Sequence, residues 1–235
     1  MKKTAQDPNK YLEYKNLMEI IDFSQEKSLV SQYMAELRDT SIQQDRLRFR
    51  RNLERIGEIM AYEISKRVNY EPADISTPLG TAKCHKICDD IVLATILRAG
   101  LPFHNGFLNY FDKAQNAFVS AYRKYKPSSD QFDIHIEYIA CPRIDGKTII
   151  IADPMLATGS SMELSYQALL TKGKPAHIHV ASVIASQQAI DFVKSHFPEE
   201  KTTVWVGVVD PELNAHSYIV PGLGDAGDLA FGDKE

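Results

Sequence analysis

The chain lacks long hydrophobic runs and has very little cysteine. Its longest apolar stretches, residues 91–97 and 204–209, are strand-sized and far shorter than the roughly 20 residues that a membrane-spanning helix needs. Lys2 and Lys3 are not followed by an apolar segment, so we expect no secretory signal, no membrane anchor and a cytoplasmic location. The 3 cysteines are an odd number in a chain of 235 residues, which is long enough to bury a core without disulfide bonds. Reduced thiols are therefore expected.

The sequence also lacks a complete metal motif and an excess of positive charge. Cys84, His85 and Cys88 lie close together, but no second pair of ligands completes a closed zinc site. The formal net charge is -4, which gives no general attraction to nucleic acid or to an anionic membrane, so an anionic ligand needs a local cluster of donors. Arginines recur between residues 46 and 55, but acidic residues interrupt them. We therefore expect a solvated or subunit-facing helix surface there.

The composition is typical of a globular protein, with 44% hydrophobic and 25% charged residues. Residues 41–68 are predicted to form one long helix. Ser41 and Gln44 form a capping box at its start, and apolar residues recur along it at helical spacing. The C-terminal segment from residue 210 has no periodicity and is rich in glycine, which lets a backbone approach a ligand closely.

From residue 90, short apolar strands alternate with helices, a pattern typical of a parallel α/β sheet. The predicted strands are residues 91–97, 117–121, 148–152, 177–185 and 203–209. The predicted helices are residues 160–172 and 187–196. The polar stretch 123–145 is long enough for a projecting arm or β-hairpin.

The most informative stretch runs from Thr148 to Ser161: a buried strand, an acidic residue, a turn of small residues and a helix start. Such a turn presents backbone N–H groups and the positive end of the helix dipole to an anion. Asp153 ends the strand and is placed to accept hydrogen bonds from sugar hydroxyls, because ligands of open parallel sheets lie beyond the carboxyl ends of the strands. For this turn alone, an ordinary strand-turn-helix connection with Ser160 or Ser161 as N-cap is an alternative.

Several motifs resemble those of the uracil phosphoribosyltransferase family. DPMLATGSS, residues 153–161, resembles the family loop DPMLATGGS, which binds phosphoribosyl pyrophosphate (PRPP). ILRAG at residues 96–100 and AYR at residues 121–123 resemble two further family motifs. YIVPGLGDAGD at residues 218–228 is nearly identical to the family's YIIPGLGDAGD. With TPLG at residues 77–80, the resemblance extends from there to the C-terminus.

This resemblance implies an α/β fold of the type I phosphoribosyltransferase kind, a parallel sheet flanked by helices with a projecting β-arm. It implies a single domain, with N-terminal helices and a hairpin (1–89), an α/β core (90–209) and a C-terminal uracil-binding hood (210–235). The implied reaction joins uracil to PRPP and gives UMP and pyrophosphate, in pyrimidine salvage. The resemblance also implies Mg²⁺ carried with PRPP, GTP binding whose effect on activity the sequence does not show, and a homodimer or higher homo-oligomer.

The resemblance also implies the site residues. The PRPP site would comprise Arg98, Arg123, Asp153, Pro154, Met155, Leu156, Ala157, Thr158, Gly159, Ser160, Ser161 and Asp225. The uracil site would comprise Ile219, Gly224, Asp225 and Ala226. Arg98, Arg123 and Asp225 are the implied catalytic residues. The two arginines fit this chemistry independently, because guanidinium groups hold a pyrophosphate through paired charge-assisted hydrogen bonds. With one acid in the loop, direct metal ligation by the protein is not expected.

Four positions depart from the family pattern. Ser160 replaces a glycine, Asn105 an aspartate, Leu229 an arginine and Asp233 a threonine. Ser160 is strained if its position requires a positive φ. Two alternatives therefore stay open: a PRPP- or uracil-binding regulatory module that keeps the fold without turnover, and an enzyme for another nucleobase.

Overall fold

The computed structural model describes residues 17–125 and 132–233, and for residues 121–125 and 132–136 it describes the backbone alone. The elements are, in chain order, β1 (Glu19–Asp22), the 3-10 helix η2 (Phe23–Gln25), α2 (Leu29–Arg38), α3 (Arg46–Ser65), β2 (Tyr70–Thr77), β3 (Gly80–Ile87), β4 (Ile91–Ile96), α4 (Gly100–Leu108), β5 (Gln115–Tyr125), β6 (Phe132–Ala140), β7 (Thr148–Ala152), β8 (Met155–Leu156), α5 (Ser160–Leu170), β9 (His177–Ser186), α6 (Gln187–His196), η3 (Glu199–Lys201), β10 (Thr202–Asp210), β11 (Glu212–Leu213), β12 (Ile219–Val220) and α7 (Ala226–Phe231). No helix in the described ranges is long and apolar enough to cross a membrane.

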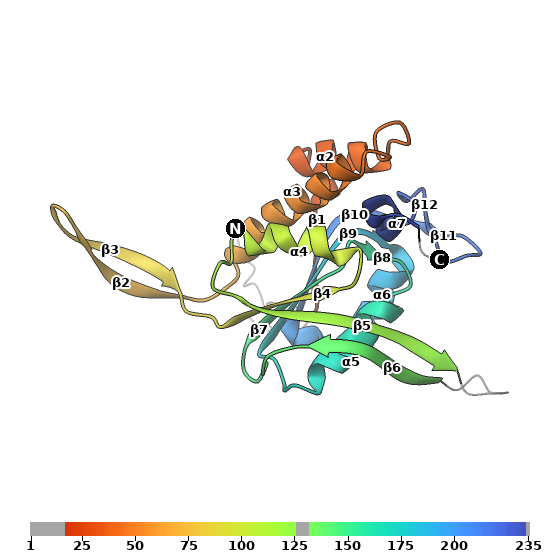
Figure 1. The fold of residues 1–235 in the computed structure, drawn as a ribbon. Coiled ribbons are helices and arrows are strands. Elements are labelled where there is room, and N and C mark those ends of the chain that lie inside the picture. The colour runs from red at the N-terminus through yellow and green to blue at the C-terminus, as the bar shows by residue number, and fades with distance from the viewer. Residues whose placement is uncertain (1–16, 126–131, 234–235) are drawn as a thin grey trace, which may run out of the picture.

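A mainly parallel sheet forms the centre of the fold, in the order β1-β10-β9-β7-β4-β5-β6 (Figure 1). All neighbours along this path run parallel except β5 and β6. The predicted parallel sheet is therefore confirmed, and β7 has the predicted bounds. The strand predicted at 117–121 is longer, because it continues into an arm with β6. The edge strand β1 was not predicted.

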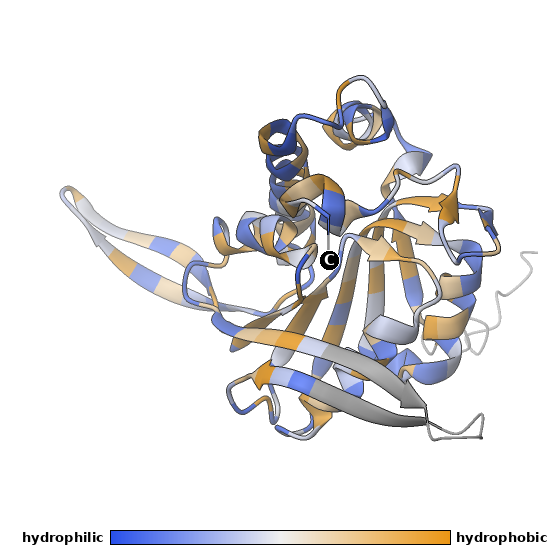
Figure 2. Cartoon of the chain, turned by 45° about the vertical axis from the view of Figure 1, so that its right-hand side comes forward, coloured by the Kyte–Doolittle hydropathy of each residue, from blue (hydrophilic) through white to orange (hydrophobic). Residues whose placement is uncertain are grey.

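Helices cover both faces of this sheet: α2, α3 and α4 lie on one side, and α5 and α6 on the other (Figure 1). Alternate strand residues enter the two cores. Leu93 and Ile150 pack with α3 and α4, whereas Val92 and Ile149 pack with α5 and α6. Figure 2 shows the strands between the helices as mainly apolar. Burial on both faces explains why they appear in the sequence as continuous apolar runs.

The helix predicted from residue 41 begins only at Arg46, and it ends at Ser65. The predicted capping box of Ser41 and Gln44 is wrong. The side chain of Asp45 caps α3 instead, accepting a hydrogen bond from a first-turn N–H at 3.1 Å. Ser41 directs its N–H and its hydroxyl to the Asp39 carboxylate, at 2.8 and 2.6 Å. Residues 39–45 therefore form a turn between α2 and α3, and the site uses this turn.

The predicted helix at 187–196 is confirmed as α6, and that at 160–172 as α5, which ends two residues earlier at Leu170. The C-terminal stretch from residue 210 has no periodicity in the sequence. It contains the short β11–β12 hairpin and the helix α7, which packs on α3. The side chain of Asp225 caps the N-terminus of this helix.

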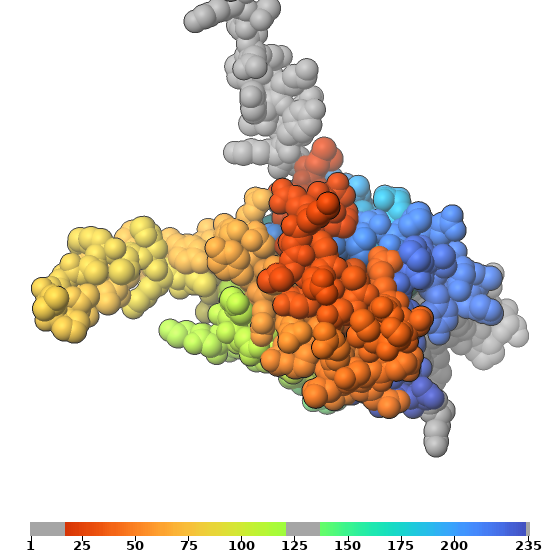
Figure 3. Space-filling view, turned by 90° about the horizontal axis from the view of Figure 1, so that it is seen from above, coloured from red at the N-terminus to blue at the C-terminus, as the bar shows by residue number. Residues whose placement is uncertain are grey.

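The β2–β3 hairpin stands away from the body of the molecule (Figures 1 and 3). Its two strands pair in antiparallel fashion from Tyr70↔Ile87 to Thr77↔Gly80. All of its side chains are exposed or half-buried. Because an isolated two-stranded hairpin is marginally stable in water, this arm has little stability of its own.

Candidate active site

The direction of winding changes between β4 and β7. The chain passes from β4 through α4 to β5 on one side, and from β7 through α5 on the opposite face to β9 on the other side. Ligands of open α/β sheets bind at such a switch point, beyond the carboxyl ends of the strands. Arg98 follows β4 and residues 153–161 follow β7, so the topology brings these two predicted segments to the same place.

Asp153 lies at the end of β7, where it is only 9% exposed. Its Oδ1 accepts a long hydrogen bond of 3.4 Å from the N–H of Met155. Burial raises the pKa of this carboxyl from 3.8 to about 7, and the hydrogen bond offsets only part of that shift. A buried carboxylate with so little stabilisation from the protein is well placed to accept hydroxyl donors from a ligand.

The turn after Asp153 has the geometry of an anion site. Gly159 is the left-handed residue, with φ 83°, and a Cβ there would lie 2.6 Å from the ring of Phe192. Ser160 is the first residue of α5, so the strain that a positive φ would impose on it does not arise. The Thr158 hydroxyl accepts from the Ser160 N–H at 3.3 Å and lies 3.1 Å from the Ser160 hydroxyl. Gly159 has no side chain to cap α5, which leaves first-turn N–H groups beyond that of Ser160 available to an anion.

Arg98 connects the end of β4 to the C-terminal segment. Its Nη2 donates to Asp228 Oδ1 at 3.1 Å and to the Gly232 carbonyl at 3.3 Å. Its Nε is buried and has no partner among the described residues. This side chain therefore carries one buried donor that no described residue satisfies. The backbone of Arg123 lies in β5 opposite Ile134, and its side chain lies outside what the structure describes.

The predicted uracil residues surround the start of α7. Ile219 is in β12 and buried, and Gly224 has φ 92° in the loop before the helix. The Asp225 carboxylate accepts from the N–H groups of residues 227 and 228 at 2.8 and 3.0 Å. Ala226 is buried and donates its N–H to Met155 Sδ at 3.4 Å. This last contact brings the Asp153–Ser161 loop against the hood.

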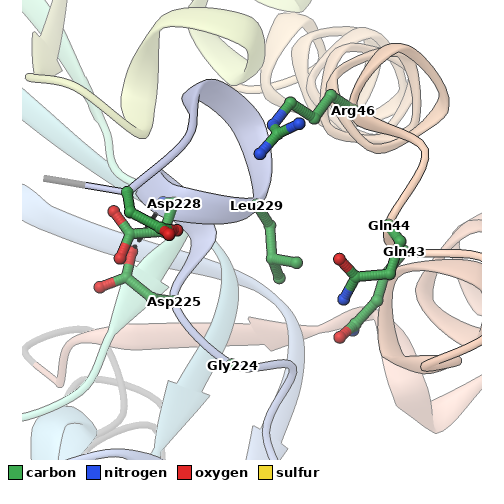
Figure 4. Close-up of a pocket in the computed structure, with 8 residues that line it drawn as sticks. Gln43, Gln44, Arg46, Gly224, Asp225, Asp228 and Leu229 are labelled. Atoms are coloured by element: carbon green, nitrogen blue, oxygen red, sulfur yellow. Dashed lines mark hydrogen bonds between the residues drawn. The ribbon is translucent and has the colours of Figure 1, made fainter.

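A cavity of about 260 Å³ opens beside this segment (Figure 4). Its lining comes from the α2–α3 turn, from α3 and from the hood, and includes Gln43, Arg46, Gly224, Asp225, Leu229 and Asp233. Two of the four departures from the family pattern, Leu229 and Asp233, therefore line one cavity. Asn105, in contrast, is exposed on α4.

Sequence reasoning missed three side chains that hold the hood. Arg38 makes a two-point ion pair with Asp210, at 2.8 and 3.1 Å, and Gln43 donates to the Leu223 carbonyl at 3.1 Å. A signal was present for Asp210, because it ends a buried strand and precedes a proline, as Asp153 does. Nothing in the local sequence marked Arg38 or Gln43, which lie more than 170 residues from their partners in the hood.

Comparison with known proteins identifies one family. The sequence model of the family described as uracil phosphoribosyltransferase matches residues 24–233. A uracil phosphoribosyltransferase of Porphyromonas gingivalis is 63% identical over 217 residues, which cover 92% of this chain and 100% of that protein. The enzyme of the same name from Methanothermobacter thermautotrophicus is 42% identical over 186 residues, covering 78% of this chain and 83% of that protein. Among solved structures, a protein from Aquifex aeolicus matches with a TM-score of 0.78 and 29% identity, covering 91% of this chain and 98% of that one.

Proposed function

Because the chain belongs to the uracil phosphoribosyltransferase family, we propose that its two facing segments divide the substrates, the Asp153–Ser161 loop binding PRPP and the hood binding uracil. The chain is a pentosyltransferase of pyrimidine salvage, which joins uracil to PRPP and releases pyrophosphate. The observation that carries the division is the Met155–Ala226 contact, which brings the two segments together. Transfer between two substrates requires their reacting atoms to be held side by side.

The loop supplies donors for the 5-phosphate and one acceptor for the ribose. Backbone N–H groups at the start of α5, with the hydroxyls of Thr158, Ser160 and Ser161, donate to the phosphate. Residues 154–157 and Gly159 shape the loop around it. Asp153 accepts hydrogen bonds from the ribose hydroxyls. Its pKa of about 7 indicates that the protein alone stabilises the ionised carboxylate poorly, so donors from a ligand would stabilise that form.

The leaving pyrophosphate develops negative charge as the ribosyl group passes through an oxocarbenium-like state. Arg98 and Arg123 donate to it, and the unpartnered Nε of Arg98 supports this role for the first. The described residues contain no group of three or more His, Cys, Asp and Glu side chains placed to hold a metal ion. One buried carboxylate and several hydroxyls fit a Mg²⁺ ion that arrives on the oxygens of PRPP, where it would neutralise part of the pyrophosphate charge.

The hood binds uracil through its backbone. The N–H groups of Gly224 and Ala226 donate to the uracil oxygens, and the Ile219 carbonyl accepts from N3. Ala226 donates to a thioether sulfur in this structure, and because sulfur is a weak acceptor, a carbonyl oxygen of the base replaces it favourably. Asp225 lies beside these groups, faces the ribose and favours loss of the N1 proton.

We also propose a homodimer or higher homo-oligomer, supported by the solvent-exposed β2–β3 hairpin, which needs further contacts for stability. The division into residues 1–89, 90–209 and 210–235 within one domain, a cytoplasmic location and GTP binding stay predictions from the sequence.

Measurement of pyrophosphate release by the purified chain with uracil, PRPP and Mg²⁺ tests this function. We expect turnover that requires all three. Binding of PRPP or uracil without turnover would instead support the regulatory module. Hypoxanthine and orotate, assayed in the same way, test the other nucleobases, and a higher kcat/KM for either would refute the assignment to uracil.

A further inference from the structure

Gln43, from outside the hood, and Asp210, the first residue of the hood, hold the backbone of its base-binding loop. Gln43, in the α2–α3 turn, donates from Nε2 to the Leu223 carbonyl at 3.1 Å. Asp210, at the end of β10, accepts from the Gly222 N–H at 2.9 Å. Figure 4 shows Gln43 and Gln44 on the opposite side of the cavity from Gly224 and α7, so the turn faces the loop. Seen from above, α2 and α3 lie beside the C-terminal part of the chain (Figure 3).

The hydrogen bond from Gln43 fixes the orientation of the Leu223–Gly224 peptide, whose N–H is proposed to bind uracil. The Leu223 carbonyl and the Gly224 N–H belong to the same planar peptide unit, in which they point in opposite directions. A hydrogen bond that holds the carbonyl toward Gln43 therefore aims the Gly224 N–H away from the α2–α3 turn. Gly224, with φ 92°, is otherwise free to rotate this plane, because glycine has no Cβ to restrict it.

Gln43 is buried, with 8% of its surface exposed, and both hydrogens of its amide are used. The second one goes to the Leu37 carbonyl at 2.8 Å, in the last turn of α2, where helix carbonyls lack partners of their own. One amide group therefore joins the end of α2 to the hood. Loss of its two donors would leave two buried carbonyls without this partner.

Asp210 holds the other side of the loop. Asp210 is 4% exposed, and Arg38 holds its carboxylate in place through hydrogen bonds of 2.8 and 3.1 Å. Gly222, to which Asp210 is bonded, has φ 64° and lies so close to the Ile219 carbonyl that a Cβ would collide with that oxygen. The Asp210 hydrogen bond therefore holds Gly222 close against the Ile219 carbonyl.

We infer that Gln43 and the Arg38–Asp210 pair are positioning residues for uracil: they orient the Gly224 N–H and the Ile219 carbonyl without contacting the base. This inference rests on the proposed function of the hood. Recognition through backbone groups depends on their placement to within about 0.5 Å. The affinity for uracil therefore depends on side chains of the α2–α3 segment, whereas the Asp153–Ser161 loop and PRPP do not depend on them.

Kinetics of four variants, compared with the wild-type protein, test the inference. Gln43→Met keeps the volume of the side chain and removes both donors, and Gln43→Glu places oxygens against the two carbonyls. Asp210→Asn weakens the ion pair. The control is Glu36→Gln, because Glu36 makes a similar two-point pair with Arg48, at 2.8 and 2.9 Å, that joins α2 to α3. This control separates a general loss of helix packing from an effect on the hood.

We expect Gln43→Met and Asp210→Asn to raise the KM for uracil about tenfold, the effect on a binding equilibrium of weakening the one hydrogen bond that each side chain makes to the base-binding loop. Gln43→Glu should raise it further. The Kd for PRPP, measured by direct titration, should stay within about twofold of wild type, as should both constants in Glu36→Gln. Amide hydrogen exchange in residues 222–226 should become faster in the Gln43 and Asp210 variants alone.

Two results overturn the inference while the proposed function stands. The first is a wild-type protein that turns over uracil while folded Gln43→Met and Gln43→Glu variants keep its KM for uracil. The second is an equal rise in the Glu36→Gln control, which would assign the effect to helix packing. A wild-type protein without uracil turnover overturns the proposed function itself. An Asp210→Asn variant that does not fold leaves the decision to the two Gln43 variants.

Discussion

The dipeptide Asp-Pro occurs at the carboxyl ends of two buried strands, β7 and β10, but the two carboxylates have different surroundings. Asp210 is held by Arg38 and accepts from the Gly222 N–H, so its bonding capacity is used within the protein. Asp153 accepts one long hydrogen bond from its own turn, and burial raises its pKa to about 7. The same local sequence therefore gives one carboxylate ready for a ligand and one that braces the fold. The difference comes from Arg38, which lies 172 residues away from Asp210.

The PRPP loop and the hood, the two halves of the site, also differ in how much they depend on distant parts of the chain. The proposed PRPP loop is built from nine consecutive residues, 153–161, and its turn is determined by local features such as the positive φ of Gly159. The hood depends on the α2–α3 turn, on the end of β10 and on the cap of α7. Damage to the first half should therefore affect PRPP, and damage to the second should affect uracil.

The largest effect should come from Thr158→Trp in the PRPP half. Thr158 is half-buried in the turn, and an indole there fills the space of the phosphate without disturbing the core, so we expect the Kd for PRPP to rise at least about 100-fold. Titration calorimetry with PRPP and Mg²⁺ measures this. Thr171→Trp, at the other end of α5, is the matched control. A folded Thr158→Trp variant with unchanged PRPP affinity would show that the phosphate site is elsewhere.

Arg98→Ala should have the next largest effect, because Arg98 acts on the leaving group between the two halves. Loss of a charge-stabilising donor commonly lowers kcat about 100-fold, whereas we expect the KM for uracil to change little. Arg143→Ala removes an arginine that is paired with Asp145 on the surface, and serves as control. We expect the same split between kcat and KM for Arg123→Ala. Near-normal kcat values in both variants would refute the pyrophosphate role.

Gly224→Val tests the hood half. A branched side chain at φ 92° strains the loop and moves the backbone groups that are proposed to bind uracil. We expect the KM for uracil to rise more than about tenfold, with PRPP affinity unchanged. Gly146→Val is a matched control, because Gly146 also has a positive φ, 69°, and its Cβ would meet no atom within 4 Å. Normal uracil kinetics in Gly224→Val would contradict backbone recognition.

The smallest effect should be a pH dependence of PRPP binding due to Asp153. Its pKa in the folded protein, about 7, is above the ordinary value of 3.8. The folded state therefore keeps a proton that the unfolded chain has lost, and this group's contribution to stability falls as the pH rises from about 4 to about 7. PRPP binding should show the opposite trend, because the ribose hydroxyls need the ionised carboxylate.

Between about pH 7 and about pH 6, wild-type affinity for PRPP should therefore fall by up to about tenfold relative to Asp153→Asn. Because PRPP titrates in the same way in both measurements, comparison with Asp153→Asn removes the contribution of the ligand's own titration. Parallel pH profiles for the two proteins would show that Asp153 does not bind as a carboxylate.

The sequence was sufficient for features that depend on short stretches of chain. The strand β7 and the helix start at Ser160 follow from buried apolar runs and turn chemistry, and the resemblance supplied the candidate residues. The start of α3 was predicted wrongly because two possible N-caps, Ser41 and Asp45, lie within five residues. The side chain of Asp45 is the one that accepts a hydrogen bond from the first turn of the helix. The roles of Arg38 and Gln43 were not predictable, because their partners are determined only by the tertiary fold.

The central claim, that the hood recognises uracil through fixed backbone groups, is tested most directly by the ratio of kcat/KM for uracil and cytosine at saturating PRPP and Mg²⁺. The amino group of cytosine would face a backbone N–H, which leaves buried donors unpaired. A site built around hydrogen bonds rejects such a mismatch strongly, so we expect uracil to be preferred at least about 1,000-fold. Cytosine turnover within about tenfold of that for uracil would contradict backbone recognition and leave only the PRPP half of the site supported.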